Sequence, residues 1–93
     1  METPQTVHEW ANNVFPNRTP ASAFLKMFEE IGEYVRDPRD GGELADIIIM
    51  LWDLGVMHGI NIQSAIDAKM VVNRGRTWRV NLETGVAQHV DRR

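Results

Sequence analysis

The sequence has no cysteine and no long uncharged apolar run, and each absence excludes a class of protein. Without cysteine, neither a disulfide framework nor a thiolate metal site can form. No apolar stretch approaches the roughly 18 residues that favour a membrane helix. The first ten residues, METPQTVHEW, lack the basic, apolar and small-residue order of a secretory signal. We therefore expect a soluble, cytoplasmic chain with no membrane partner.

Basic residues are also too few to give the chain a broad positive field. The formal net charge is −3, which disfavours binding to duplex nucleic acid. The length of 93 residues and the hydrophobic content of 43% fit a single small domain over residues 1–93. Such a domain can build only a modest core, so self-association is expected to cover the remaining apolar surface.

Two pairs of acidic residues stand on either side of a helix-breaking segment, DPRDGG at 37–42. Glu30 and Glu33 precede the break, and Glu43 and Asp46 follow it. Residues three apart share one face of a helix, so two helices folded back on each other would bring the four carboxylates together. Hard divalent cations such as Mg²⁺ favour oxygen ligands of this kind.

The pattern of apolar residues on the two helices helps to decide between a metal site and a simple solvent-exposed acidic face. On the first acidic helix an apolar stripe of four residues lies opposite the charged side, which taken alone predicts a solvated acidic face. The stripe consists of Phe24, Phe28, Ile31 and Val35. The second helix is apolar almost all round, which predicts burial, and only Glu43, Asp46 and Asp53 interrupt it. Buried carboxylates must be paired, protonated or bound to a metal, which favours a site.

Caps and breakers predict an all-α fold with a small appendage. Thr6 and Thr19 are candidate N-caps, and Gly59 can close a helix in the left-handed conformation. We expect an antiparallel helical bundle with a short C-terminal hairpin or flap, completed by oligomerisation. The expected helices are 6–15, 20–36, 43–58 and 62–76, followed by the hairpin after Trp78 and a polar tail ending in Arg92 and Arg93.

The third long helix changes character along its inner face. This face begins with Ile62, Ala65 and Ile66 and continues with cationic and polar groups, an unusual pattern for a core. A binding role and simple snorkelling of long side chains at the bundle end both account for it. The groups concerned are Lys69, Asn73 and Arg76.

Four segments together resemble the MazG-like, all-α nucleoside triphosphate pyrophosphohydrolases over residues 22–90. They are EEIGE at 29–33, GELADIII at 42–49, HGINI at 58–62 and KMVVNRGRTW at 69–78. The signature of that family is ExxE, a spacer, then ExxD, and the short spacer here is most similar to compact phage-encoded members. If the chain is phage-encoded, its location would be the host cytoplasm.

The resemblance implies hydrolysis of a nucleoside triphosphate to the monophosphate and pyrophosphate with Mg²⁺ or Mn²⁺. It implies metal ligation by Glu30, Glu33, Glu43 and Asp46, with Glu30 and Glu33 also acting in catalysis. Glu29 is a catalytic candidate that either orients or deprotonates the attacking water, or is a surface charge. The substrate-binding residues would be Lys26, Lys69, Asn73, Arg76 and Trp78, where Trp78 either stacks on a base or seals the bundle end. No glycine-rich phosphate loop is present, so the metals would carry most phosphate recognition.

Substrate and assembly are less determined by the sequence. The resemblance favours a purine deoxynucleotide such as dGTP, and a pyrimidine pyrophosphatase acting on dUTP or dCTP is the alternative. A non-catalytic helical oligomerisation module would explain the apolar helices but not the four acids. A di-iron bundle would need Glu-x-x-His pairs, which are absent. The expected assembly is a homodimer or homotetramer.

Overall fold

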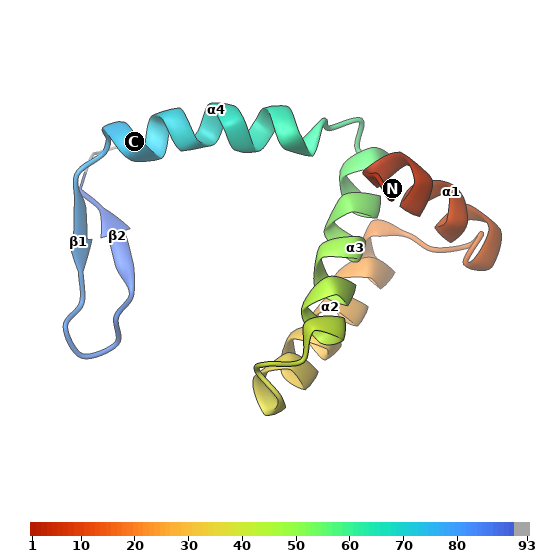
Figure 1. Cartoon of the computed structure of the whole chain (residues 1–93), viewed down its shortest axis with the longest axis horizontal. Coiled ribbons are helices and arrows are strands. Elements are labelled where there is room, and N and C mark those ends of the chain that lie inside the picture. The colour runs from red at the N-terminus through yellow and green to blue at the C-terminus, as the bar shows by residue number, and fades with distance from the viewer. Residues whose placement is uncertain (91–93) are drawn as a thin grey trace. The chain divides into compact units, whose positions relative to one another are not determined.

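The computed structural model describes residues 1–90, which form four helices and a two-stranded hairpin (Figure 1). This confirms the predicted all-α fold and the C-terminal hairpin; Arg92 and Arg93 of the predicted polar tail lie outside the described residues. The elements are α1 (Pro4–Val14), α2 (Pro20–Arg36), α3 (Gly41–Met57), α4 (Ile62–Gly75), β1 (Trp78–Val80) and β2 (Ala87–His89). No single described helix is long and apolar enough to cross a membrane; α3 and α4 meet that test only as a pair bent at a break.

The chain divides into two compact units, Met1–Ile62 and Gln63–Arg93. The first contains α1, α2 and α3, and the second contains nearly all of α4 together with the hairpin. The single domain expected over residues 1–93 therefore stays a prediction.

Short polar side chains determine where the first two helices begin. The Thr3 hydroxyl accepts from the Thr6 backbone N–H, and the Thr6 hydroxyl accepts from the Thr3 backbone N–H at 2.9 Å. This capping box and Pro4 in the first turn start α1 earlier than predicted, so the assignment of Thr6 as the cap was wrong. The start of α2 is confirmed, because Thr19 caps it with Ser22 in the same reciprocal arrangement.

The third helix also begins earlier than predicted. The Asp40 carboxylate accepts from the backbone N–H groups of Gly42 and Glu43, which makes Asp40 the N-cap and brings both glycines into α3. At the other end the chain leaves α3 through Gly59, whose φ of 67° confirms the predicted left-handed residue.

In the first unit, α3 packs against both α1 and α2, and the short 37–40 connection turns α2 and α3 antiparallel (Figure 1). Among the described residues, the buried apolar side chains are Val7 and Ala11. The apolar stripe of α2 (Phe24, Phe28, Ile31 and Val35) faces outward: Phe28 is 70% exposed. Glu30 on the acidic side of α2 is buried, which agrees with the favoured site and not with a plain solvated face.

The α3 helix is less covered than its composition predicted. Its large apolar side chains at Leu44, Ile48 and Leu51 are exposed in the isolated chain. Two of its polar or small residues, Asp53 and Gly55, are the buried ones. The predicted burial of α3 on every side would require another element or another chain to cover it, because α1 and α2 leave these side chains exposed.

The hairpin of the second unit is a short antiparallel ladder in which Trp78 pairs with His89. Their rings meet edge to face at 5.9 Å, and the Trp78 indole N–H donates to the Asn73 carbonyl at 3.0 Å. The Asn81 side chain accepts from two backbone N–H groups of the turn, which ends at Gly85 with φ of 75°. Trp78 thus joins the hairpin to the end of α4.

Candidate functional site

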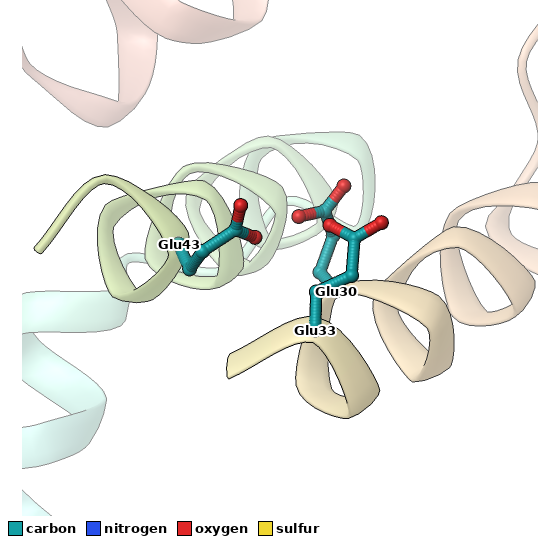
Figure 2. Close-up of side chains that lie close together, drawn as sticks. All are labelled: Glu30, Glu33 and Glu43. Atoms are coloured by element: carbon teal, nitrogen blue, oxygen red, sulfur yellow. The ribbon is translucent and has the colours of Figure 1, made fainter. Parts of the chain in front are cut away.

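Three carboxylates meet between α2 and α3. Glu30 and Glu33 lie one turn apart on α2, and Glu43 lies in the first turn of α3 (Figure 2). One oxygen from each residue lies within 4.8 Å of the other two. The N-cap at Asp40 determines this geometry, because starting α3 there places Glu43 beside the final turns of α2.

The charges in this cluster are poorly compensated by the protein itself. Glu30 Oε2 and Glu43 Oε2 are buried without a hydrogen-bond partner. Burial raises the pKa of Glu43 to about 7, and hydrogen bonding of its protonated form to Glu33 and Glu30 acts in the same direction. Unpartnered carboxylate oxygens arranged in this way fit a hard divalent cation, which would supply the missing positive charge.

Lys26 is the cation nearest this cluster among the described side-chain contacts. Its ammonium lies 3.2 Å from Glu30 Oε1 and 3.3 Å from Glu29 Oε1. Bonding to Glu30, and then to Glu29, raises the pKa of Lys26. Glu29 is exposed and stands outside the group of three carboxylates, so its role as a general base stays a prediction.

Asp46 does not belong to the group of three within residues 1–90. It lies one turn beyond Glu43 on α3, is exposed, and lines a neighbouring cavity. Its assignment as a fourth metal ligand stays a prediction.

The remaining predicted site residues belong to the second unit. Trp78 makes the hairpin contacts described above, and its assignment as a substrate-binding residue stays a prediction. The assignments of Lys69, Asn73 and Arg76 as substrate-binding residues are predictions that the geometry of the first unit does not address.

Sequence reasoning missed a buried ion-pair network that connects three elements. Asp53 on α3 is 7% exposed and accepts from Arg18 Nε at 2.7 Å and Arg18 Nη2 at 2.8 Å. Its Oδ1 also lies 2.8 Å from His8 Nδ1 on α1. Arg18 chiefly, and His8 in addition, lower the pKa of Asp53. The one available signal was an acid on an apolar helix, which predicts a partner without identifying it.

A cavity of about 300 Å³ lies next to this network in the first unit. Aromatic and apolar side chains form most of its lining, and its polar residues include members of both the network and the acidic region. Its residues are Val7, Trp10, Ala11, Phe15, Arg18, Ser22, Ala23, Lys26, Asp46, Ile49, Met50 and Asp53.

Comparison with known proteins identifies relatives along nearly the whole chain. A family model described as dATP/dGTP pyrophosphohydrolase matches residues 4–93. A dATP/dGTP diphosphohydrolase of Salmonella phage PMBT28 is 42% identical over 82 residues, which cover 87% of this chain and 28% of that protein. The chain thus spans little more than a quarter of that relative. A dATP/dGTP diphosphohydrolase of Cyanophage S-2L is 35% identical over 83 residues, covering 87% of this chain and 78% of that protein.

A solved structure has the same fold. It is the Cyanophage S-2L MazG-like pyrophosphohydrolase, bound to dGDP and three catalytic Mn²⁺ ions per active site. The TM-score is 0.84 at 33% identity, and the match covers 95% of this chain and 93% of that chain. The predicted MazG-like resemblance is confirmed, and the chain belongs to the dATP/dGTP pyrophosphohydrolase family.

Proposed function

We propose that this chain is a metal-dependent hydrolase that converts dATP or dGTP to the monophosphate and pyrophosphate. The observation that carries the proposal is the cluster of Glu30, Glu33 and Glu43, in which two buried oxygens have no partner. The relatives named for dATP and dGTP support a purine substrate, in agreement with the expected dGTP, and give no support to dUTP or dCTP.

The acidic residues of the first unit would hold the metal. Glu30, Glu33 and Glu43 provide the clustered oxygens, and Asp46 is the proposed fourth ligand. Bound there, Mg²⁺ or Mn²⁺ would neutralise phosphate oxygens and lower the pKa of a coordinated water. Glu29, next to Glu30 in sequence, is the proposed acceptor of that water's proton.

Basic residues would bind the triphosphate. Lys26 already stands against Glu30, and a cation entering the cluster would compete with it and release its ammonium toward the substrate. Lys69 and Arg76 are proposed to neutralise further phosphate charge, with Asn73 as a hydrogen-bond partner. Trp78, whose indole N–H donates to the Asn73 carbonyl, is proposed either to stack on the base or to seal the bundle end.

A homo-oligomer is the proposed working form. The outward stripe on α2 and the exposed apolar residues of α3 support a contact with a second copy. A dimer or tetramer would cover them. Because the relatives are phage proteins, we place the working enzyme in the cytoplasm of an infected host.

The proposed reaction is tested by locating the bond that breaks. The chain is incubated with Mn²⁺ and, in turn, dATP, dGTP, dCTP or dUTP in ¹⁸O-labelled water. The products are separated by chromatography and their masses are measured by mass spectrometry. Attack at the α phosphorus puts the label in the monophosphate of dATP and dGTP. Label only in the released pyrophosphate, or faster turnover of dUTP and dCTP, would contradict the proposal.

A further inference from the structure

A series of three hydrogen bonds joins the two helices that carry the carboxylate cluster. The Asp37 backbone N–H donates to the Glu33 carbonyl at 3.2 Å, and the Asp40 N–H donates to the Asp37 carbonyl at 3.1 Å. The Asp40 carboxylate in turn accepts from the Glu43 N–H at 3.3 Å. The series begins and ends on members of the cluster, Glu33 on α2 and Glu43 on α3. The connection between the helices therefore links the two halves of the cluster directly.

The connection itself is a β-turn over residues 37–40. The bond between the Asp40 N–H and the Asp37 carbonyl closes it. Asp37 at the first position and Pro38 at the second are residues that such turns favour, and the proline ring fixes one backbone dihedral. At the start of α3, Asp40 Oδ1 also accepts from the Gly42 N–H at 2.9 Å. A Cβ at Gly42 would lie 3.1 Å from that oxygen, so glycine permits this close approach.

The cluster requires its members to be held in place before a cation binds. Its three carboxylates have oxygens within 4.8 Å of one another and repel one another when ionised (Figure 2). Glu43 stands alone on α3, so the repulsion would be relieved if the start of α3 moved away from α2. Asp40 opposes this movement because it holds the backbone of Glu43 itself. Within residues 1–90, Asp40 stands outside the group of three carboxylates.

Resting on the proposed function, we infer that Asp40 is a positioning residue for the metal. It acts on Mn²⁺ or Mg²⁺ through Glu43 and the 37–40 turn, and not as a ligand. The separation of the two ligand-bearing helices, and with it the affinity for the cation, is then determined by a turn that contributes no ligand. Removal of a group that orients metal ligands typically weakens metal binding by about 10- to 100-fold.

Three substitutions distinguish positioning from the general loss of a helix cap. Asp40→Ala removes the cap of α3. Asp40→Asn removes the charge but keeps an oxygen that can accept the same two N–H groups. Thr19→Ala removes the cap of α2, at the end of that helix remote from Glu33. Calorimetry measures the Kd for Mn²⁺ and the melting temperature in a chelator, and pyrophosphate release measures dGTP turnover.

We expect Asp40→Ala to raise the Kd for Mn²⁺ by about tenfold or more and to lower kcat, whereas Asp40→Asn should stay near the wild type. Thr19→Ala should lower the melting temperature about as much as Asp40→Ala does but keep the wild-type Kd for Mn²⁺. An equal loss of Mn²⁺ affinity in both Asp40 variants would overturn the inference in favour of Asp40 as a ligand. Equal Kd values in Asp40→Ala and Thr19→Ala would also overturn it.

An insertion tests the turn without removing a side chain. One glycine inserted between Pro38 and Arg39 lengthens the turn and separates the Asp37 carbonyl from the Asp40 N–H. Surface loops tolerate such insertions, so the variant should fold. Its Kd for Mn²⁺ should rise by about tenfold. If Asp40→Ala does not fold, an unchanged Kd in this insertion variant would refute the inference.

The control is an insertion into the other helix connection of the first unit. One glycine between Pro16 and Asn17 disrupts the turn in which the Arg18 N–H donates to the Phe15 carbonyl at 3.2 Å. The Kd for Mn²⁺ should not change, and an equal rise in both insertion variants would contradict a specific role of the 37–40 turn. A wild type that binds Mn²⁺ but hydrolyses no triphosphate would refute the proposed function alone, because the Kd values would still decide the positioning role. A wild type that binds no Mn²⁺ would overturn both.

Discussion

Glu43 makes the stability of the metal-free chain depend on pH near neutrality. Its pKa is raised from 4.5 to about 7, so between these values the folded state keeps a proton that the unfolded state has lost. Stability is therefore lost as pH rises through this window. We expect the melting temperature, measured in a chelator, to fall between about pH 5 and pH 7.5.

The Glu43→Gln variant isolates this effect. It removes the titrating group, so most of the fall across the window should disappear, and the melting-temperature gain from Mn²⁺ should shrink with it. Glu9→Gln is the matched control, because Glu9 is an exposed acid on α1. An unchanged pH slope in Glu43→Gln would show that the shifted pKa belongs elsewhere.

Glu33 tests the same cluster through activity. Glu33→Gln is nearly isosteric and should leave folding and assembly intact, but it removes a negative ligand atom from the cluster. We expect kcat to fall by roughly a hundredfold or more, as is typical when a group acts mainly in the transition state. Steady-state pyrophosphate release measures it, with Glu9→Gln again as control; near-wild-type turnover would remove Glu33 from the site.

For individual residues, the sequence predicted which acidic side chains lie close together better than it predicted which basic side chains pair with acids. The spacing of Glu30, Glu33 and Glu43 was sufficient, because helical periodicity determines which residues share a face. The ion pair of Arg18 and Asp53 was not predictable, since 35 residues separate its members and only the packing of the helices brings them together. The position of Asp46 beside a cavity was not predictable either, because the cavity also depends on the packing of the helices.

At the scale of elements, Gly55 permits the turn that follows α3. A Cβ at this position would lie 2.5 Å from Ile62 Cδ1, so Gly55→Ala would push against the start of α4. Overpacking costs about 1–3 kcal/mol and outweighs the roughly 1 kcal/mol gained in helix propensity. We expect a lower melting temperature by calorimetry.

Gly41→Ala is the control for this substitution. Gly41 lies in the same helix, and a Cβ there would meet nothing within 4 Å. Its melting temperature should equal or exceed that of the wild type. If both variants melt alike, the contact between Gly55 and Ile62 has no effect on stability.

Element types were predictable, whereas the starts of helices were less so. All four helices and the hairpin were predicted, because amphipathic periods and the breakers around Pro38 and Gly59 are local signals. The starts of α1 and α3 were placed two residues late, since Thr3 caps α1 in place of Thr6, and Asp40 caps α3 ahead of the two glycines that were assigned to the breaker. Only the actual hydrogen bonds decide between neighbouring caps.

For the whole molecule, the outward stripe on α2 predicts assembly. Phe28 is 70% exposed, so in an isolated chain Phe28→Glu would have little effect on folding. In an assembly it places a charge in an apolar interface, and we expect light scattering to show a lower mass than the wild type. Leu82→Glu is the control, because Leu82 lies in the hairpin turn at 97% exposure. A wild type that is monomeric at micromolar concentration would contradict the prediction.

Because few apolar residues are buried, the stability of the folded chain should depend on the protein concentration. Within residues 1–90 the buried apolar side chains are Val7 and Ala11, so in the proposed assembly association would supply much of the folding free energy, and association depends on concentration. Each tenfold dilution of a dimer weakens association by about 1.4 kcal/mol. A cell with few copies would hold mostly unassembled chains, and nucleotide breakdown would begin only once synthesis passed a threshold.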